Sequence, residues 1–311
     1  MPRVSIGLPI YNGELYLRET LDSLLAQTYA DFELLISDNG STDGTQRICE
    51  EYAARDPRVK YYREAENRGA AWNYNRVVEL ATGEYFKWAA HDDLCAPTYL
   101  EKCIEVLDRD PGVVLCFPDD QDIDKESTPI DARRATHVPG DMRASSPKAS
   151  ERLRNLARYD HDCEEVFGLV RLEVLRKTRL IQSYTDSDRT LLGELGLYGR
   201  FHQVPEPLFL HRHHSSSSCR ANPVEGGWHE RARWFDPGLS NRVLFSQWRQ
   251  LWEYSRAIMR APLGLPEKAK CFFWLGVRYR HRLGDLGREA VTGVRLATQS
   301  RESKHVAREV S

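Results

Sequence analysis

Short apolar runs alternate with helical patterns through the first 120 residues, and each run has the length of one strand. The strand-like runs are Val4–Ile10, Phe32–Ile36, Val59–Arg63, Glu84–Ala90 and Val113–Phe117. Between the first two runs, leucines at i, i+4, i+7 and i+8 from Leu17 form one apolar face of a helix. Strands that alternate with helices predict right-handed crossovers and a largely parallel sheet flanked by helices.

The pattern changes after the fifth run. Residues 118–150 are rich in Asp, Pro, Ser and Arg, and they predict a long irregular segment. Leu191–Tyr198 predicts a helix that ends at a glycine. Residues 201–204 and 207–211 predict two short strands, and a run of His and Arg follows the second of them.

The last third of the chain combines tryptophan with arginine in helical segments that break at Pro262 and Pro266. Residues 297–311 lose the apolar periodicity and predict a frayed tail. We therefore divide the chain into an α/β part at 1–120, a second part of the same domain at 121–224, and a helical C-terminal region at 225–311.

Charge and cysteine content narrow the class of protein. The net charge of −2 gives no global field that favours nucleic acid. Seven cysteines without a Cys-x-x-Cys pair indicate neither a disulfide framework nor a zinc knuckle, and they favour a reduced, cytoplasmic compartment. The chain enters its first strand with no signal peptide before it, and no apolar run has the length of a membrane span.

Polar clusters follow three of the predicted strands at the point where each strand ends. Tyr11-Asn12-Gly13 follows the first strand, Asp38–Gly44 the second, and His91-Asp92-Asp93 the fourth. Ligands of open α/β sheets bind beyond the carboxyl ends of the strands. We therefore expect these clusters to converge on one site.

The adjacent carboxylates of Asp92 and Asp93 indicate a cation. Two neighbouring carboxylates repel each other unless a cation or hydrogen bonds compensate them. Mg²⁺ and Mn²⁺ prefer oxygen ligands of this kind, taken together with phosphate oxygens of a bound ligand. The alternative is a capped turn at the start of the helix that contains Pro97, and the position at a strand end favours the cation.

The Asp38–Gly44 segment has two glycines, which allow a tight turn, and the helix start that follows it is expected to attract phosphate. Asp38 is placed to accept an N–H from a base edge, whereas capping alone explains Asp43. In Asn67-Arg68-Gly69, an arginine just before a helix suits a bidentate phosphate clamp or a solvated turn.

Two further clusters lie in the second part of the chain. A carboxylate of Asp186-Ser187-Asp188 suits a general base toward a hydroxyl, with a helix cap as the alternative. The imidazoles of His211–His214 suit metal ligation, with an exposed loop as the alternative.

In order and spacing, these segments resemble family 2 glycosyltransferases with the GT-A fold, over roughly residues 3–120. The resemblance implies a Rossmann-like α/β sheet and an inverting transferase that uses a nucleotide-diphosphate sugar with Mn²⁺ or Mg²⁺. UDP is the expected donor nucleotide, and GDP or dTDP would fit the same residues. The acceptor would be a hydroxyl of a glycan or of a lipid-linked glycan.

The resemblance also implies residue roles. Nucleotide binding falls on the backbone and side chains of Pro9, Tyr11, Asn12, Asp38, Arg68 and Asp92. Within this set Asp38 would bind the base and Asp92 would face the ribose or the sugar, while Asp93 would ligate the metal.

The resemblance is weaker in the second part of the chain, where it implies a catalytic base and a further metal ligand. Asp188 precedes Gly199-Arg200-Phe201 at the family's spacing and takes the role of catalytic base, with Asp186 as its competitor because the acid before the base is Ser187 here. An Arg-x-His pattern makes His214 the favoured metal ligand and His213 the fallback. The family's first acid in Asp-x-Asp is replaced by histidine at position 91.

Other classes of protein fit less well. A dinucleotide-linked oxidoreductase needs Gly-x-Gly-x-x-Gly after the first strand, and a sugar nucleotidyltransferase typically has a glycine-rich, basic first loop. A non-catalytic nucleotide-binding or scaffold module stays an alternative. The C-terminal helices are expected to pack on the catalytic part or on a second subunit, with peripheral contact to the inner face of the membrane as the alternative hypothesis.

Overall fold

The computed structural model describes residues 1–130, 144–158, 163–214, 235–236, 238 and 245–292. The tail predicted at 297–311 and the middle of the segment predicted to be irregular lie outside these residues.

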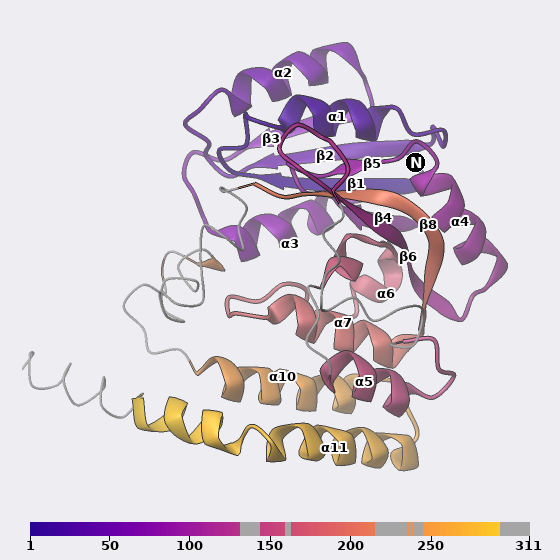
Figure 1. The fold of residues 1–311 in the computed structure, drawn as a ribbon, viewed down its shortest axis with the longest axis vertical. Helices are drawn as coiled ribbons and strands as arrows, with labels where there is room; N and C mark the ends of the chain where they lie inside the picture. The colour runs from indigo at the N-terminus through magenta and orange to yellow at the C-terminus, as the bar shows by residue number, and fades with distance from the viewer. Residues whose placement is uncertain (131–143, 159–162, 215–234, 237, 239–244, 293–311) are drawn as a thin grey trace, which may run out of the picture.

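One mixed sheet organises the described part of the chain, with strands in the order β3-β2-β1-β4-β7-β6-β8-β5 (Figure 1). The strands are β1 Val4–Ile10, β2 Phe32–Asp38, β3 Val59–Arg63, β4 Tyr85–Trp88, β5 Leu94–Cys95, β6 Val113–Ile123, β7 Leu169–Arg171 and β8 Arg200–Arg212. Neighbours among β3, β2, β1 and β4 pair in parallel, which confirms the parallel sheet predicted for this half. β7 is antiparallel to both β4 and β6, and β5 is antiparallel to β8.

Helices cover both faces of the sheet. They are α1 Leu17–Leu25, α2 Thr45–Arg55, α3 Ala70–Leu80, α4 Tyr99–Arg109, α5 Ala149–Arg158, α6 Leu172–Leu175 and α7 Ser187–Tyr198, with a 3₁₀ turn η1 at Glu164–Phe167. Figure 1 shows α1 and α2 on one side of the sheet and α3 on the other. Two clusters of buried apolar side chains, one on each face, form the core between these layers.

The structure corrects the prediction for the two long strands. β6 continues through Ile123, so an irregular segment beginning at residue 118 is wrong, and β8 is one strand rather than two. Irregular pairing explains the apparent break, because the register of β6 against β8 shifts on both sides of Asp119, which pairs with Pro207. Proline cannot donate a ladder hydrogen bond and is confined to such bulges and edges.

The C-terminal region forms a third layer. α10 Ser246–Arg260 packs against α7, and α11 Leu265–Arg280 packs against α5, as the sequence favours. A third apolar cluster fills the space between these helices. None of the helices in the described ranges combines the length and apolar composition that a bilayer crossing requires.

A buried asparagine of α3 ties the ends of β1 and β2 together. The side-chain amide of Asn73 donates to the carbonyl oxygen of Ile10 at 3.2 Å and to that of Ser37 at 2.9 Å. Its side chain is almost fully buried. The two strand ends that carry the first polar clusters are therefore held by one side chain from the helix layer.

Replacing this amide tests its contribution. Asn73→Ala removes both hydrogen bonds from buried carbonyl groups, and it is expected to lower the free energy of unfolding by about 1–3 kcal/mol in urea denaturation. The control is Gln46→Ala, which removes a bond to Glu50 on the exposed side of α2 and is expected to cost less than about 0.5 kcal/mol. Equal losses in the two variants would contradict the role given to Asn73.

Candidate functional site

The turn after β1 is bonded directly to the turn after β2. The backbone N–H of Asn12 donates to Oγ of Ser41 at 2.9 Å, and that of Gly13 donates to Oγ1 of Thr45 at 2.9 Å. In the other direction, the N–H of Thr42 donates to Oδ1 of Asn12 at 2.8 Å. Asn12 has a φ of 52°, a left-handed conformation that asparagine adopts more readily than most residues. The first two predicted clusters therefore form one unit.

Two carboxylates occupy the start of α2. The N–H of Gly44 donates to Oε2 of Glu14 at 2.5 Å, and that of Thr45 donates to Oδ1 of Asp43 at 3.0 Å. Asp43 thus accepts the first N–H of the helix, although the N-cap residue is Gly44. Glu14 and Asp43 accept two of the N–H groups at this helix start, and the expectation that it attracts phosphate stays a prediction.

Asp38 lies at the end of β2 and is fully buried. Its Oδ1 accepts the N–H of Ser41 at 2.8 Å, and its Oδ2 accepts the hydroxyl of Tyr61 at 2.6 Å. Burial and this bond to a carboxylate raise the pKa of Tyr61, so the phenol stays protonated as a donor. Nε of Arg63 approaches the same oxygen at 3.5 Å. Hydrogen bonds to both oxygens therefore fix the orientation of the Asp38 carboxylate. Its binding of a nucleotide base stays a prediction.

The Asn67-Arg68-Gly69 segment attaches to the same unit. The side chain of Asn39 donates to Oδ1 of Asn67 at 2.9 Å and accepts the N–H of Arg68 at 3.0 Å. Gly69 has a φ of 89°, which a residue with a side chain rarely adopts. The guanidinium of Arg68 lies 4.1 Å from the ring centroid of Trp72 and is half exposed, so it is available to a ligand beside the turns.

The acid-bearing turn after β4 adjoins the turn after β1. A Cβ atom on Gly13 would lie only 2.6 Å from Cδ2 of His91, so the two turns are in contact. The hydroxyl of Thr20 in α1 lies 3.0 Å from the carbonyl oxygens of both His91 and Asp93. The three polar clusters predicted at strand ends are thus contiguous.

The two carboxylates of this turn have different partners. Oδ1 of Asp93 accepts the backbone N–H of Arg212 at 2.9 Å, and Nδ1 of His211 lies 3.5 Å from the same oxygen. Oδ2 of Asp92 lies 2.9 Å from Nε2 of His214. Burial acts to raise the pKa of Asp92, but the hydrogen bond from His214 and the nearby imidazoles outweigh it and lower this pKa to about 2. Asp92 is therefore ionised at neutral pH.

Arg212 is a site residue to which the sequence assigned no role. Its side chain is fully buried, with Nε donating to the carbonyl oxygen of Asp92 at 2.8 Å and Nη2 to Oε2 of Glu19 at 2.9 Å. Nη1 donates to Oγ of Ser127 at 2.9 Å, and the guanidinium lies 4.5 Å from the ring centroid of Tyr16. A buried cation persists only with such partners. Arg212 therefore fixes the backbone of the acid-bearing turn.

Two acids near the histidines were also missed. Oδ1 of Asp122 lies 2.7 Å from Nε2 of His213, the fallback metal ligand. Oε1 of Glu164 lies 4.0 Å from Nδ1 of His211. Asp122 lies in the part of β6 that the sequence did not predict, and Glu164 lies in η1. Neither contact can be predicted from the sequence without knowledge of the order of the strands in the sheet.

Asp188 lies in the first turn of α7 and is partly exposed, while Asp186 directly precedes the helix with a φ of 64°. Oδ1 of Asp188 accepts the N–H of Arg189 at 2.7 Å. Burial, followed by the negative charge of Asp188, raises the pKa of the Cys163 thiol. η1 packs against α7, and its Glu164 approaches His211, which in turn lies near Asp93.

The donor chemistry of the acid-bearing turn suits a hard divalent cation that retains phosphate oxygens of a ligand. Among the described residues, no group of three or more His, Cys, Asp and Glu side chains is arranged as a metal site. His214 contacts Asp92, whereas the sequence predicted it as a ligand beside Asp93. Two carboxylates are too few ligands for a cation by themselves, so a cation at this turn would need phosphate oxygens of a bound ligand.

Solved structures share this fold. TarS of S. aureus, solved with UDP, superposes with a TM-score of 0.54 over 91% of this chain and 92% of that chain, at 17% identity. Mannosyltransferase PcManGT of Pyrobaculum calidifontis, solved with GDP-Man and Mn²⁺, gives a TM-score of 0.51 over 95% of this chain and 84% of that chain, at 18% identity. These likenesses establish the GT-A fold with a C-terminal helical region.

Curated relatives match the first part of the chain. It is 42% identical over 108 residues to an uncharacterized glycosyltransferase of Rickettsia typhi, across 35% of this chain and 33% of that protein. It is 35% identical over 130 residues to chondroitin synthase of Escherichia coli, across 42% of this chain and 19% of that protein. The matched stretch thus spans a third or less of each relative. The family model for glycosyl transferase family 2 matches residues 5–179, more than half of the 311 residues, so the chain belongs to this family.

Proposed function

We propose that this chain is an inverting glycosyltransferase that moves a sugar from a nucleotide-diphosphate sugar to a hydroxyl of a glycan or glycolipid acceptor. The observation that carries the proposal is the contact between the acid-bearing turn after β4 and the joined turns after β1 and β2. Parallel strands with polar turns at their carboxyl ends are the usual place for a nucleotide in such sheets.

The nucleotide would lie across the joined turns. Tyr11 directly follows β1 and is exposed, and the half-exposed guanidinium of Arg68 is attached through Asn39 to the same unit. The backbone at Pro9 and Asn12 would line the nucleotide, and Asp38 would bind its base. The ligands of TarS and PcManGT support a nucleotide-diphosphate sugar as the class of donor. Of the nucleotides, we propose UDP.

The diphosphate end would lie at the acid-bearing turn. Asp93 and His214 would hold Mn²⁺ or Mg²⁺, which requires Nε2 of His214 to exchange Asp92 for the ion. When bound, such a cation stabilises the negative charge that develops on the leaving diphosphate. Asp92 is ionised and would accept hydrogen bonds from hydroxyls of the ribose or the sugar.

The transfer itself needs one base. Asp188 would take the proton from the acceptor hydroxyl while the acceptor oxygen attacks the anomeric carbon, and the bond from that carbon to the diphosphate breaks on the opposite side. A single displacement inverts the configuration at that carbon. The partial exposure of Asp188 at the start of α7 leaves its carboxylate accessible to an acceptor.

A binding screen tests the class of ligand. Calorimetric titration with UDP, GDP, dTDP and their sugar conjugates, each with and without Mn²⁺, is expected to give binding for one nucleotide and to strengthen with the metal. Release of the same nucleoside diphosphate from its sugar conjugate and an acceptor would identify a transferase. Absence of binding for every nucleotide would contradict the proposal.

The base role predicts a separation of turnover from binding. Asp188→Asn is expected to lower kcat by about 10²–10⁴-fold, while the Kd of the nucleotide stays within a factor of about two. The matched control is Asp186→Asn, two residues earlier, which is expected to retain most of the turnover. The reverse ranking of the two variants would move the base role to Asp186.

The metal role predicts a loss that depends on Mn²⁺. Asp93→Ala is expected to abolish the gain in nucleotide affinity that Mn²⁺ provides, because a hard cation loses its carboxylate ligand. Asp31→Ala, just before the other end of β2, is the control and is expected to retain that gain. An unchanged Mn²⁺ dependence in Asp93→Ala, measured by calorimetry, would exclude Asp93 as the ligand.

A further inference from the structure

The helix α10 buries polar side chains in its first two turns and Tyr254, Ala257 and Ile258 in its later turns, and it also exposes several large apolar side chains. The buried side chains of its first two turns are polar: Ser246, Gln247, Gln250 and Glu253. The exposed apolar side chains along the helix and at its N-cap are Phe245, Trp248, Trp252 and Met259. Trp252 is 59% exposed and Met259 62%. On the surface of a globular protein, the large apolar side chains of a helix normally face the core.

The inward orientation is fixed by hydrogen bonds. Oε1 of Gln250 accepts from Nη2 of Arg278 at 3.2 Å and from the hydroxyl of Tyr279 at 3.1 Å, both in α11. The carboxylate of Glu289 accepts the N–H groups of Gln247 and Trp248 at the start of α10. Rotating the helix to bury its tryptophans would break these bonds, so the outward aromatic face is part of the folded structure.

The same outward face is cationic. Its exposed charged residues are Arg249, Arg256 and Arg260, of which Arg260 also pairs with the buried Glu194 at 2.6 Å. The single acid of α10, Glu253, is buried and bonded to Arg249 at 2.9 Å and to Arg179 at 3.3 Å. Within α10 itself no acidic side chain faces solvent, whereas Glu289, after α11, accepts the backbone N–H of Trp248.

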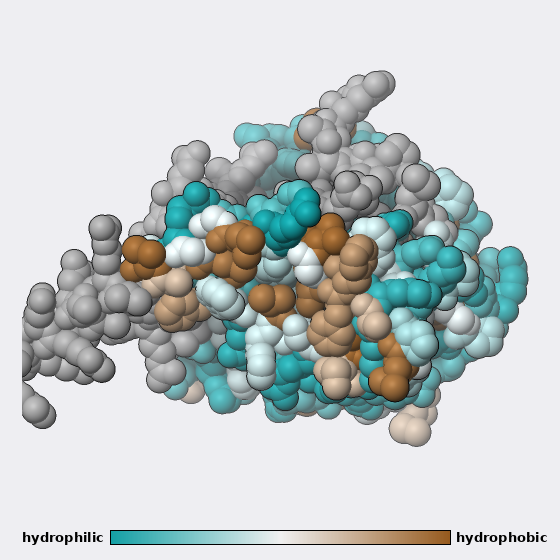
Figure 2. All heavy atoms as spheres, turned by 90° about the horizontal axis from the view of Figure 1, so that it is seen from below, coloured by the Kyte–Doolittle hydropathy of each residue, from teal (hydrophilic) through white to brown (hydrophobic). Residues whose placement is uncertain are grey.

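The helix α11 extends this surface. Its exposed apolar side chains include Leu265, Phe272 and Phe273, and Arg280 is exposed near its end. Leu275 and Arg278 of the same helix are buried. Figure 2 shows hydrophobic residues spread along this side of the molecule. We call the outward sides of α10 and α11 the aromatic–basic face.

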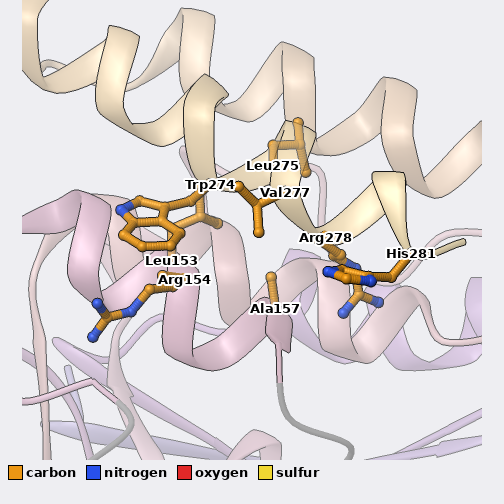
Figure 3. Close-up of a pocket in the computed structure, with 8 residues that line it drawn as sticks. All are labelled: Leu153, Arg154, Ala157, Trp274, Leu275, Val277, Arg278 and His281. Carbon is orange, nitrogen blue, oxygen red and sulfur yellow. The ribbon is translucent and has the colours of Figure 1, made fainter.

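A hollow of about 180 Å³ lies between α5 and α11, next to this face (Figure 3). Apolar side chains such as Leu153, Ala157 and Val277 line it, and Arg278 and His281 lie toward one end. The guanidinium of Arg154 lies 5.0 Å from the ring centroid of Trp274, which contacts the exposed Phe273. The apolar lining of such a hollow suits part of a lipid acyl chain, and the cationic groups near it suit the lipid phosphate.

Charge decides between two occupants of the face. A second copy of the chain would place this face, on which exposed arginines outnumber exposed acids, against an identical face, and like charges in contact are unfavourable. An anionic bilayer provides phosphates for the arginines and an interface in which tryptophan is favoured. We propose that the aromatic–basic face binds peripherally to an anionic lipid bilayer, with α10 and α11 lying along its surface. This inference is independent of the transfer reaction.

Vesicle flotation with the full chain tests the proposal. The chain is expected to float with mixed phosphatidylcholine–phosphatidylglycerol vesicles at low salt, to bind less as salt rises, and to stay behind with phosphatidylcholine alone. Trp252→Ala is expected to weaken partitioning about tenfold through lost apolar burial. Arg256→Ala is expected to weaken it about fivefold through lost attraction to anionic lipid.

Matched variants on the far side of the molecule are the controls. Leu15→Ala removes an apolar side chain that is 72% exposed ahead of α1, and Arg55→Ala removes an exposed arginine at the end of α2. Both are expected to partition like the unchanged chain, and unfolding curves check that every variant is folded. Failure to float at low salt, equal losses in the control variants, or a dimer that Trp252→Ala dissociates without any flotation would overturn the proposal.

Discussion

The candidate site depends on the bond between the end of β8 and the turn that carries Asp92 and Asp93. The backbone N–H of Arg212 donates to the carboxylate of Asp93, and its buried guanidinium donates to the carbonyl oxygen of Asp92. Leu94 and Cys95, which directly follow Asp93, form β5 and pair with β8. Burying an arginine costs several kcal/mol of desolvation unless its donors are satisfied, and here acceptors from three segments surround it. The position of the acids is therefore set by residues about 120 positions away in sequence.

Local pattern predicts the first half of the fold well. The bounds of β1 and β3 agree with the predicted Val4–Ile10 and Val59–Arg63. β1 is a continuous apolar run because helices cover both of its faces, whereas β3 is a mostly exposed edge strand whose valine and tyrosines favour the strand conformation. β6 and β8 were shortened or divided because their later parts are polar or contain proline. Those residues are strands through pairing with each other, and pairing between distant segments leaves no periodic signal.

The same limit applies to the site. The sequence placed the polar clusters at strand ends, and the structure brings them together as predicted. The sequence did not predict which histidine contacts which acid. His211 approaches Asp93 and His214 approaches Asp92, and each pair is more than 110 residues apart in the chain. Glu14 at the start of α2 is a similar case, because the sequence did not predict that a carboxylate 30 residues away accepts an N–H there. Local motifs locate the chemistry, and tertiary contacts decide its partners.

The most direct test of the account is a crystal structure with a nucleoside diphosphate and Mn²⁺, using the anomalous signal of manganese. The account predicts a manganese peak beside the carboxylate of Asp93, with the diphosphate next to it and the base toward Asp38. A nucleotide bound on another face of the molecule, or a manganese peak away from the acid-bearing turn, would contradict it.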